Sequence, residues 1–300
     1  QPSTKCRNRH WRSEGRGQNA RTKGMKKKLS SRGGRWFEFD PRRTALVLID
    51  MQRDFIDEDG ACGPCSDSSL VPRLQSVLGA ARRAKLRIVH TRYGYKADLS
   101  DLRESARRHS KDAGVEYGSP GPLGRILVEG EGGFQFVKEL RPRDGELVVT
   151  KTSFGAFATT DLETHLLRGS ISHLLFAGVT ANCCVESTLR EAVDRGFYCC
   201  TLSDGTAASN RRLHHNTLDA IQADSNILGD VATCADFIRA LSDALLPPTA
   251  ETTTTTTEAK KKRLRSCSSE SDLSTDDDHL SRDDDDDHLS RDDDDDHLSR

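Results

Sequence analysis

One apolar run decides how this chain folds: Leu46-Val47-Leu48-Ile49-Asp50-Met51-Gln52. Two later runs repeat its pattern, Val148-Val149-Thr150-Lys151 and Gly178-Val179-Thr180-Ala181-Asn182-Cys183-Cys184-Val185. Each run ends on a reactive side chain, first an acid, then an amine, then a thiol. Because active sites of open α/β sheets form at the carboxyl ends of the strands, we expect these three groups to meet there.

Strand-like and helix-like segments alternate through the middle of the chain. The expected strands are 44–50, 87–91, 146–150, 173–177, 197–202 and 228–231. The expected helices are 70–85, 162–168, 184–194, 213–223 and 235–245. This alternation predicts a three-layer α/β/α fold with a mostly parallel six-stranded sheet and right-handed crossovers. Between strands two and three, residues 93–133 form a long stretch rich in glycine, proline and charge, which is typical of a functional loop.

The two ends of the chain differ in composition from its middle. Residues 1–36 are basic and polar, and we expect them to be a disordered N-terminal segment. Residues 37–246 carry most of the aliphatic side chains and form the expected folded domain. Residues 247–300 are a low-complexity tail with a threonine run, a basic run and acidic repeats. Each repeat has one leucine, which cannot bury a face, so we expect a solvated, disordered tail.

Charge and cysteine usage limit the partners and the compartment. The net charge is −2, and no apolar run is long enough to span a membrane, so we expect no membrane partner. The nine scattered cysteines favour a reducing, cytoplasmic location over a disulfide framework. The basic run 260–265 is compatible with nuclear import or with a solubilising linker. We expect no nucleic-acid partner, because the middle of the chain lacks a basic face.

The three reactive side chains have complementary chemistry. Cys184 opens a predicted helix, whose N-terminal partial charge should lower the thiol pKa and whose N–H groups can hold an oxyanion. Lys151 should favour the thiolate, and Asp50 can accept and return a proton. Each residue alone has a structural explanation: a buried small hydrophobe, a snorkelling amine or a helix cap. Their occurrence at three strand ends favours catalysis.

These motifs resemble the isochorismatase-like cysteine hydrolases over residues 42–242. The segment Ile49-Asp50-Met51-Gln52-Arg53-Asp54-Phe55 is similar to the catalytic aspartate motif of that family, and Lys151 falls on its lysine. The segment from Gly178 to Glu186 is similar to its nucleophile loop. The family places its cysteine six residues after the glycine, which selects Cys184 over Cys183.

The resemblance implies roles for individual residues. It implies a catalytic triad, a cis peptide between Val179 and Thr180, and an oxyanion hole made by the N–H groups of Thr180 and Cys184. The expected substrate-binding residues are Gln52, Phe55, Arg92 and Phe157, although Phe55 could equally pack in the core and Arg92 could form a structural ion pair. We expect no cofactor and no metal, since His90 lacks the Asp-x-His partners of nicotinamidases. The family also implies a homo-oligomer, either a dimer or a tetramer.

The expected substrate is a small amide, ureide or carbamoyl compound, cleaved at a C–N bond with water through a thioester. Segments 90–99, 118–127 and 190–196 look most like biuret hydrolase, N-carbamoylsarcosine amidase and ureidoacrylate amidohydrolase. Residues 152–157 depart from the biuret hydrolase loop, which puts biuret itself in doubt. The alternatives are an isochorismatase-like or nicotinamidase-like hydrolase of another small substrate, and a catalytically silent binding or scaffold protein.

Overall fold

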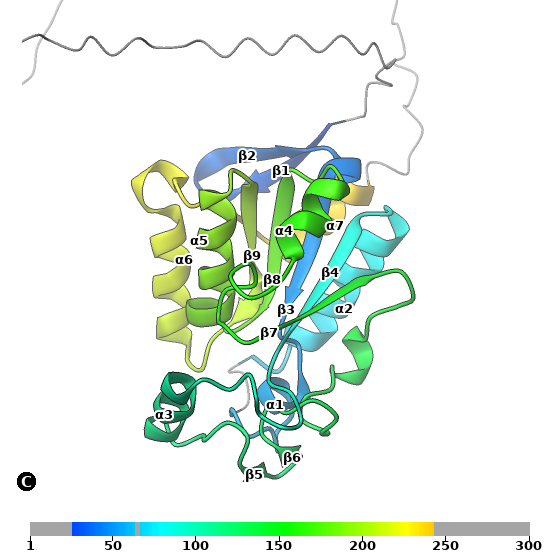
Figure 1. The fold of residues 1–300 in the computed structure, drawn as a ribbon. Coiled ribbons are helices and arrows are strands. Elements are labelled where there is room, and N and C mark those ends of the chain that lie inside the picture. Colours follow the sequence, from blue (N-terminus) through cyan, green and yellow to red (C-terminus); the bar gives the residue numbers. More distant parts are fainter. Residues whose placement is uncertain (1–25, 64–66, 243–300) are drawn as a thin grey trace, which may run out of the picture. The chain divides into compact units, whose positions relative to one another are not determined.

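A six-stranded sheet forms the centre of the protein, whose computed structural model describes residues 26–63 and 67–242. Every neighbouring pair in this sheet is parallel. The strands in spatial order are β10 (Asp230–Ala232), β9 (Tyr198–Ala207), β8 (His173–Val179), β3 (Thr44–Ile49), β4 (Arg87–Tyr93) and β7 (Leu147–Lys151). The predicted mostly parallel six-stranded sheet is therefore confirmed (Figure 1).

Helices cover both faces of the sheet, as the continuous apolar strands predicted. All six residues of β3 are buried, because side chains on both of its faces are covered. On one face lie α2 (Leu70–Arg83) and α7 (Cys234–Ser242). On the other face lie α4 (Leu162–Arg168), α5 (Glu186–Asp194) and α6 (Arg211–Asn226). Figure 1 shows α5 and α6 on one side of the sheet and α2 on the other, which confirms the three-layer architecture.

The order of the strands reverses between β3 and β8. From β3 the chain proceeds to β4 and β7 on one side, whereas from β8 it proceeds to β9 and β10 on the other. Connections that leave two neighbouring parallel strands in opposite directions open a crevice at their carboxyl ends. A ligand site is therefore expected beyond Ile49 and Val179.

The segment between β4 and β7 lies at this carboxyl edge. It contains α3 (Glu104–Asp112), the short strands β5 (Pro120–Gly121) and β6 (Gly124–Arg125), and a 3₁₀ turn at Lys138–Leu140. Together with α1 (Arg53–Ile56) it forms the lower part of the molecule in Figure 1. The segment predicted as a long functional loop therefore faces the crevice.

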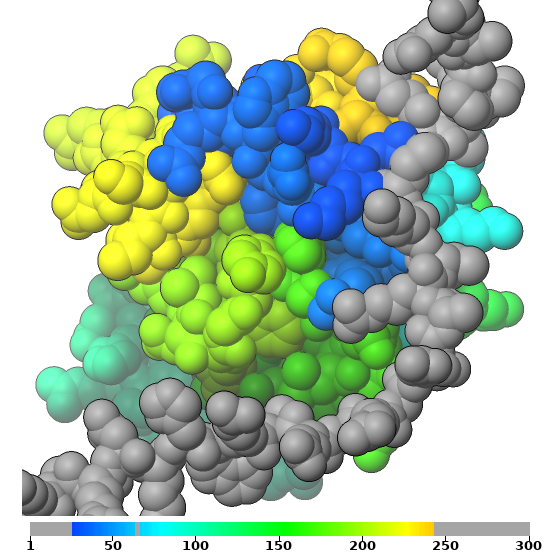
Figure 2. All heavy atoms as spheres, turned by 90° about the horizontal axis from the view of Figure 1, so that it is seen from above, coloured from blue at the N-terminus to red at the C-terminus, as the bar shows by residue number. Residues whose placement is uncertain are grey.

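A hairpin precedes the sheet and was not predicted. The antiparallel strands β1 (Lys27–Ser31) and β2 (Arg35–Phe39) are joined by a turn at Arg32–Gly34, and a second turn at Pro41–Arg43 leads into β3. Figure 2 shows this hairpin in blue near α7 in gold, and its first strand also contacts β10. Residues 27–36 are thus part of the folded domain and not of a disordered segment, whereas residues 1–25 lie outside the described residues.

Replacing Leu29 with alanine should destabilise the whole domain. Leu29 is fully buried in the cluster that α2 and α7 share, so its truncation leaves a cavity and should cost about 2–5 kcal/mol of unfolding free energy. Lys28→Ala, on the same strand but exposed, should change stability by about 0.5 kcal/mol or less. Urea unfolding of both variants measures this; equal effects would mean that the hairpin is not part of the cooperative core.

Element boundaries agree with the predictions within a few residues, with one informative difference. Strands β8 and β9 extend further than expected, to Val179 and Ala207. Within α6 the backbone leaves helical geometry at Ala223, where the predicted helix ended. No helix among residues 26–63 and 67–242 is long and apolar enough to cross a membrane. The predicted tail 247–300 and the end of the last helix lie outside the described residues.

Candidate active site

Asp50 directly follows β3 and is completely buried. Its backbone is left-handed, with φ of 50°, a conformation that aspartate tolerates better than most residues. The Thr91 hydroxyl on the neighbouring strand β4 donates to Asp50 Oδ1 at 2.7 Å. The Asp50 N–H in turn donates to the Thr91 carbonyl at 3.2 Å. Thr91, which the sequence analysis did not identify, therefore fixes the orientation of the carboxylate.

Lys151 is the last residue of β7 and is completely buried. Because β4 lies between β3 and β7, its long side chain has to reach across one strand, roughly 10 Å between strand axes. Its Nζ lies 2.7 Å from Asp50 Oδ2 and donates to the Ser153 carbonyl at 3.1 Å. Burial acts to lower the pKa of Lys151, but the negative charges of Asp50 and a Cys184 thiolate outweigh it and raise the pKa above its usual value. The amine is therefore a fixed positive charge.

Cys184 lies in a wide helical turn, Ala181–Val185, that runs directly into α5. The thiol is buried and interacts with Lys151 and Asp50. Its pKa is raised, first by a hydrogen bond with Cys183 and then by burial and by the Asp50 charge, with Lys151 opposing the change. The helix N-terminus is expected to lower this pKa, but the hydrogen bond with Cys183 and burial act in the opposite direction. A thiol in this environment needs a base, and Asp50 is beside it.

The turn before Cys184 has the backbone form that the resemblance implied. The peptide bond between Val179 and Thr180 is cis. The Thr180 carbonyl accepts hydrogen bonds from the N–H groups of Cys183 and Val185, at 3.1 and 3.2 Å. These bonds hold the turn closed around Cys184. The role of the Thr180 and Cys184 N–H groups as an oxyanion hole stays a prediction.

Gln52 lies next to Asp50, to whose carbonyl its N–H donates at 2.7 Å, but its side chain is fully engaged with backbone. The Gln52 Oε1 accepts from Tyr93 N at 2.7 Å, and its Nε2 donates to the carbonyls of Tyr93 at 3.0 Å and Phe134 at 3.4 Å. Gln52 therefore fixes the end of β4. Phe55 is half-buried and packs against the cluster that contains Tyr93 and Tyr95.

The structure does not bring Arg92 and Phe157 to the triad. Arg92 follows Thr91 and precedes Tyr93 on β4, so its side chain points to the opposite face of the sheet. There its guanidinium stacks over the rings of Phe134 and Phe136, at 4.6 and 5.3 Å. Phe157 is buried against the ring of Phe197, 6.0 Å away, in the core on the α5 side.

Three tyrosines beside the triad were missed by the sequence analysis. The Tyr93 ring lies 4.6 Å from Lys151 Nζ, and its hydroxyl is 2.8 Å from that of Tyr95. Tyr117 packs against both rings, at 5.6 and 5.9 Å, and Phe154 lies 5.8 Å from Tyr93. Burial raises the pKa of each tyrosine, and the charge of Cys184 contributes to all three shifts. A cluster of neutral phenols therefore lies beside the lysine of the predicted triad.

His90, the residue without the Asp-x-His partners of nicotinamidases, is buried in the middle of β4. Its Nε2 lies 3.0 Å from Glu146 Oε2, and its ring packs edge-on against Phe136. Glu146 also binds the Arg82 guanidinium through both oxygens, at 2.7 and 2.8 Å. Residues 26–63 and 67–242 contain no group of three or more histidine, cysteine or acidic side chains that could hold a metal ion.

Neutralising Glu146 should change how stability depends on pH. Burial acts to raise the Glu146 pKa, but hydrogen bonds from Arg82, the Arg143 N–H and His90 lower it from 4.5 to about 2. The stability that this group contributes is therefore present above pH 4.5 and is lost as the pH falls toward 2. We expect Glu146→Gln to lower the melting temperature near neutral pH and to cost progressively less in acid. An equal loss at all pH values, or the same profile for the exposed Glu139→Gln, would contradict this account.

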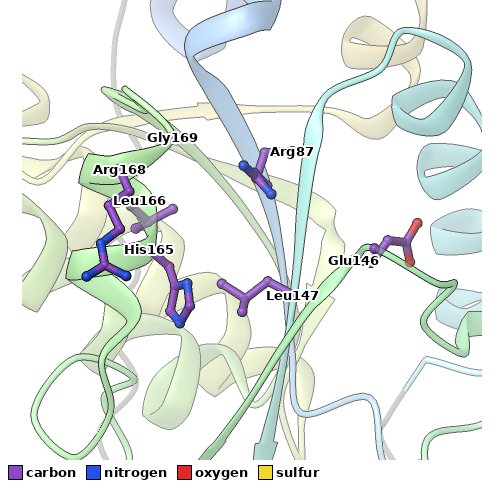
Figure 3. A pocket seen from close by; sticks show the side chains of 8 residues that line it. Arg87, Glu146, Leu147, His165, Leu166, Arg168 and Gly169 are labelled. Atoms are coloured by element: carbon purple, nitrogen blue, oxygen red, sulfur yellow. The ribbon is translucent and has the colours of Figure 1, made fainter.

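A separate pocket of about 330 Å³ lies at the opposite ends of the strands (Figure 3). It is lined by Arg87 and Leu147, the first residues of β4 and β7, and by the end of α4 with His165 and Arg168. Glu146 turns away from these two basic side chains in Figure 3. The carboxyl end of a helix disfavours anions, so the basic groups there have a structural role as partners of the helix dipole.

Comparison with known proteins places this geometry in a family. The isochorismatase domain matches residues 44–236. The ureidoacrylate amidohydrolase RutB of Rhizobium rhizogenes (strain K84 / ATCC BAA-868) is 29% identical over 217 residues, which cover 68% of this chain and 85% of the relative. The RutB of Cronobacter sakazakii (strain ATCC BAA-894) is 30% identical over 176 residues, covering 56% of this chain and 76% of the relative.

Solved structures show the same fold. A cysteine hydrolase from Pseudomonas syringae pv. phaseolicola 1448A has a TM-score of 0.60 and 25% identity, covering 69% of this chain and 95% of that chain. An N-carbamoylsarcosine amidase from Thermoplasma acidophilum has a TM-score of 0.50 and 20% identity, covering 64% and 96%, and shows the fold alone. The resemblance predicted from three short motifs is thus confirmed, and the chain belongs to the isochorismatase family of hydrolases.

Proposed function

We propose that this protein is a thiol-dependent amidohydrolase that cleaves a C–N bond of a small amide, ureide or carbamoyl compound. One observation carries the proposal: the buried ion pair of Lys151 and Asp50, 2.7 Å long, lies beside the buried thiol of Cys184. A buried charge pair is expensive to desolvate, so its placement against a nucleophile favours catalysis over a purely structural role. The similarity to ureidoacrylate amidohydrolases supports a ureide as the substrate.

The first chemical step forms a thioester. Asp50 accepts the proton of the Cys184 thiol, and the sulfur attacks the carbonyl carbon of the substrate. The N–H groups of Thr180 and Cys184 stabilise the tetrahedral oxyanion. The C–N bond then breaks, and Asp50 returns the proton to the departing nitrogen, which leaves as ammonia or an amine.

The second step releases the acyl group. Asp50 accepts a proton from a water molecule that attacks the thioester carbonyl, the C–S bond breaks, and Asp50 returns the proton to the leaving sulfur to regenerate the Cys184 thiol. Lys151 remains charged throughout, because its raised pKa keeps it protonated. Its charge stabilises the thiolate each time it forms and holds Asp50 in place. The neutral tyrosines beside it exclude water and offer hydroxyl groups to a polar, planar substrate.

Ammonia release from a panel of compounds tests the proposal. The panel contains biuret, ureidoacrylate-type ureides, N-carbamoyl amino acids and nicotinamide, each assayed with the wild-type protein and with Cys184→Ala. Release that disappears in the variant would support a thiol amidohydrolase and identify its substrate class. Release that persists would exclude the thiol mechanism, and no release from any compound would favour the catalytically silent alternative.

A further inference from the structure

The loop 152–160, which follows Lys151, is held by hydrogen bonds within the loop and by one to the lysine. The Thr152 N–H donates to Thr159 Oγ1 at 3.2 Å, which closes the loop at its base. The Ser153 hydroxyl lies 2.9 Å from the same Thr159 oxygen and donates to the Gly155 carbonyl at 2.8 Å. The Ser153 carbonyl accepts the hydrogen bond from Lys151 Nζ. The conformation of this loop therefore determines where one of the two oxygen partners of the lysine lies.

One carboxylate outside the triad holds the far side of this loop. Glu191 Oε2 accepts the Phe157 N–H at 2.8 Å. The same carboxylate lies directly against Gly155, where an added Cβ would come within 2.4 Å of it. In the part of the chain that the structure describes, the Glu191 side chain forms no ion pair. Its carboxylate instead contacts the loop backbone at Phe157 and Gly155, so the loop is the structural partner of this side chain.

Glu191 belongs to α5, the helix into which the turn that holds Cys184 runs directly. It lies seven residues after Cys184 along the chain. Four residues further on, the Arg195 guanidinium stacks over Phe157 at 4.9 Å and donates to the Glu191 carbonyl at 2.8 Å. The same helix thus places the thiol and holds the loop that orients the lysine.

We propose that Glu191 is a positioning residue that sets the Lys151 ammonium relative to Asp50 and Cys184 by fixing the loop 152–160. The inference rests on the proposed function only in the expected change of kcat, because the position of Lys151 can be tested without turnover. Without the carboxylate, the Phe157 N–H loses its acceptor and Gly155 loses the side chain packed against it. The Ser153 carbonyl is then free to move, and Lys151 Nζ loses a hydrogen-bond acceptor held in a fixed position. A misplaced charge stabilises the Cys184 thiolate less, since electrostatic stabilisation depends on preorganised geometry.

The chain offers two independent ways to break the contact and a matched control. Glu191→Ala removes the carboxylate, and Gly155→Ala pushes it away from the loop side. Glu191→Gln keeps the size and an acceptor oxygen, so it should recover part of the effect. Asp194→Asn removes a charge from an exposed position of the same helix without touching the loop.

The decisive readout is the pH profile of Cys184 alkylation by iodoacetamide, resolved at the peptide level by mass spectrometry. We expect the apparent pKa of the Cys184 thiol to rise by about one unit in Glu191→Ala and in Gly155→Ala, but not in Asp194→Asn. With an active substrate, kcat should fall roughly 10- to 100-fold while KM stays within about threefold, and Glu191→Gln should be intermediate.

Two results would overturn the proposal. The first is an unchanged alkylation profile in a Glu191→Ala protein that melts like the wild type. The second is an equal shift in Asp194→Asn, which would assign the effect to net charge alone. If Glu191→Ala fails to fold, Glu191→Gln and Gly155→Ala decide by the same readout. Alkylation requires no turnover, so it tests the position of Lys151 even if no panel compound is hydrolysed.

Discussion

Replacing Cys184 with alanine is expected to abolish hydrolysis, with kcat falling by roughly a thousandfold or more. In the proposed mechanism the thiol forms the bond to the substrate carbonyl, and no other described side chain beside Asp50 and Lys151 could replace it except Cys183. The variant should remain folded, because a buried thiol is exchanged for a smaller apolar group. Ammonia release, together with a thermal unfolding curve, measures both expectations.

Cys183→Ala is the matched control for this experiment. Cys183 is adjacent in sequence, is also a thiol and is more exposed than Cys184. We expect it to keep activity within about tenfold, since its loss removes only a hydrogen bond to the nucleophile. Mass spectrometry of a rapidly quenched reaction should find the acyl adduct on Cys184. An adduct on Cys183, or a greater loss in Cys183→Ala, would reverse the assignment of the two thiols.

The positions of the three triad residues could be predicted because they depend on a strong pattern. Strands buried on both faces are continuous apolar runs, and a polar residue at the end of such a run has few structural explanations. The hairpin β1–β2 could not be predicted in this way. In its first strand, Lys27–Ser31, only Leu29 is apolar. Alternate residues of this strand are buried, but lysine and serine at those positions give no apolar alternation in the sequence.

The surroundings of the triad were only partly predictable. Alternation along β4 places Thr91 and Tyr93 on one face and Arg92 on the other, so the sequence already implies that Arg92 does not share the face of Thr91. Tyr117 lies in the long segment between β4 and β7, where no periodicity predicts a position. The loop after Lys151 has no period either, and the ring that reaches Tyr93 belongs to Phe154 and not to Phe157.

Removing the charge of Lys151 should destabilise the protein as well as inactivate it. Lys151→Met leaves the Asp50 carboxylate buried with the Thr91 hydroxyl but without its cation. Breaking a buried ion pair by removing one partner typically costs about 3–5 kcal/mol of unfolding free energy. Urea unfolding of Lys151→Met beside the wild type measures this, and an unchanged free energy of unfolding would contradict it.

The double variant Asp50→Asn with Lys151→Met separates the charge from the packing. It removes both members of the pair, so neither is left buried alone, and its loss should be smaller than the sum of the two single losses. A coupling of about 1–3 kcal/mol would show that the site depends on the pair and not on either residue. Strict additivity would contradict a coupled pair. Both single variants and the double variant should be inactive, so stability regained without activity would show that the ion pair is retained for the chemistry of Cys184.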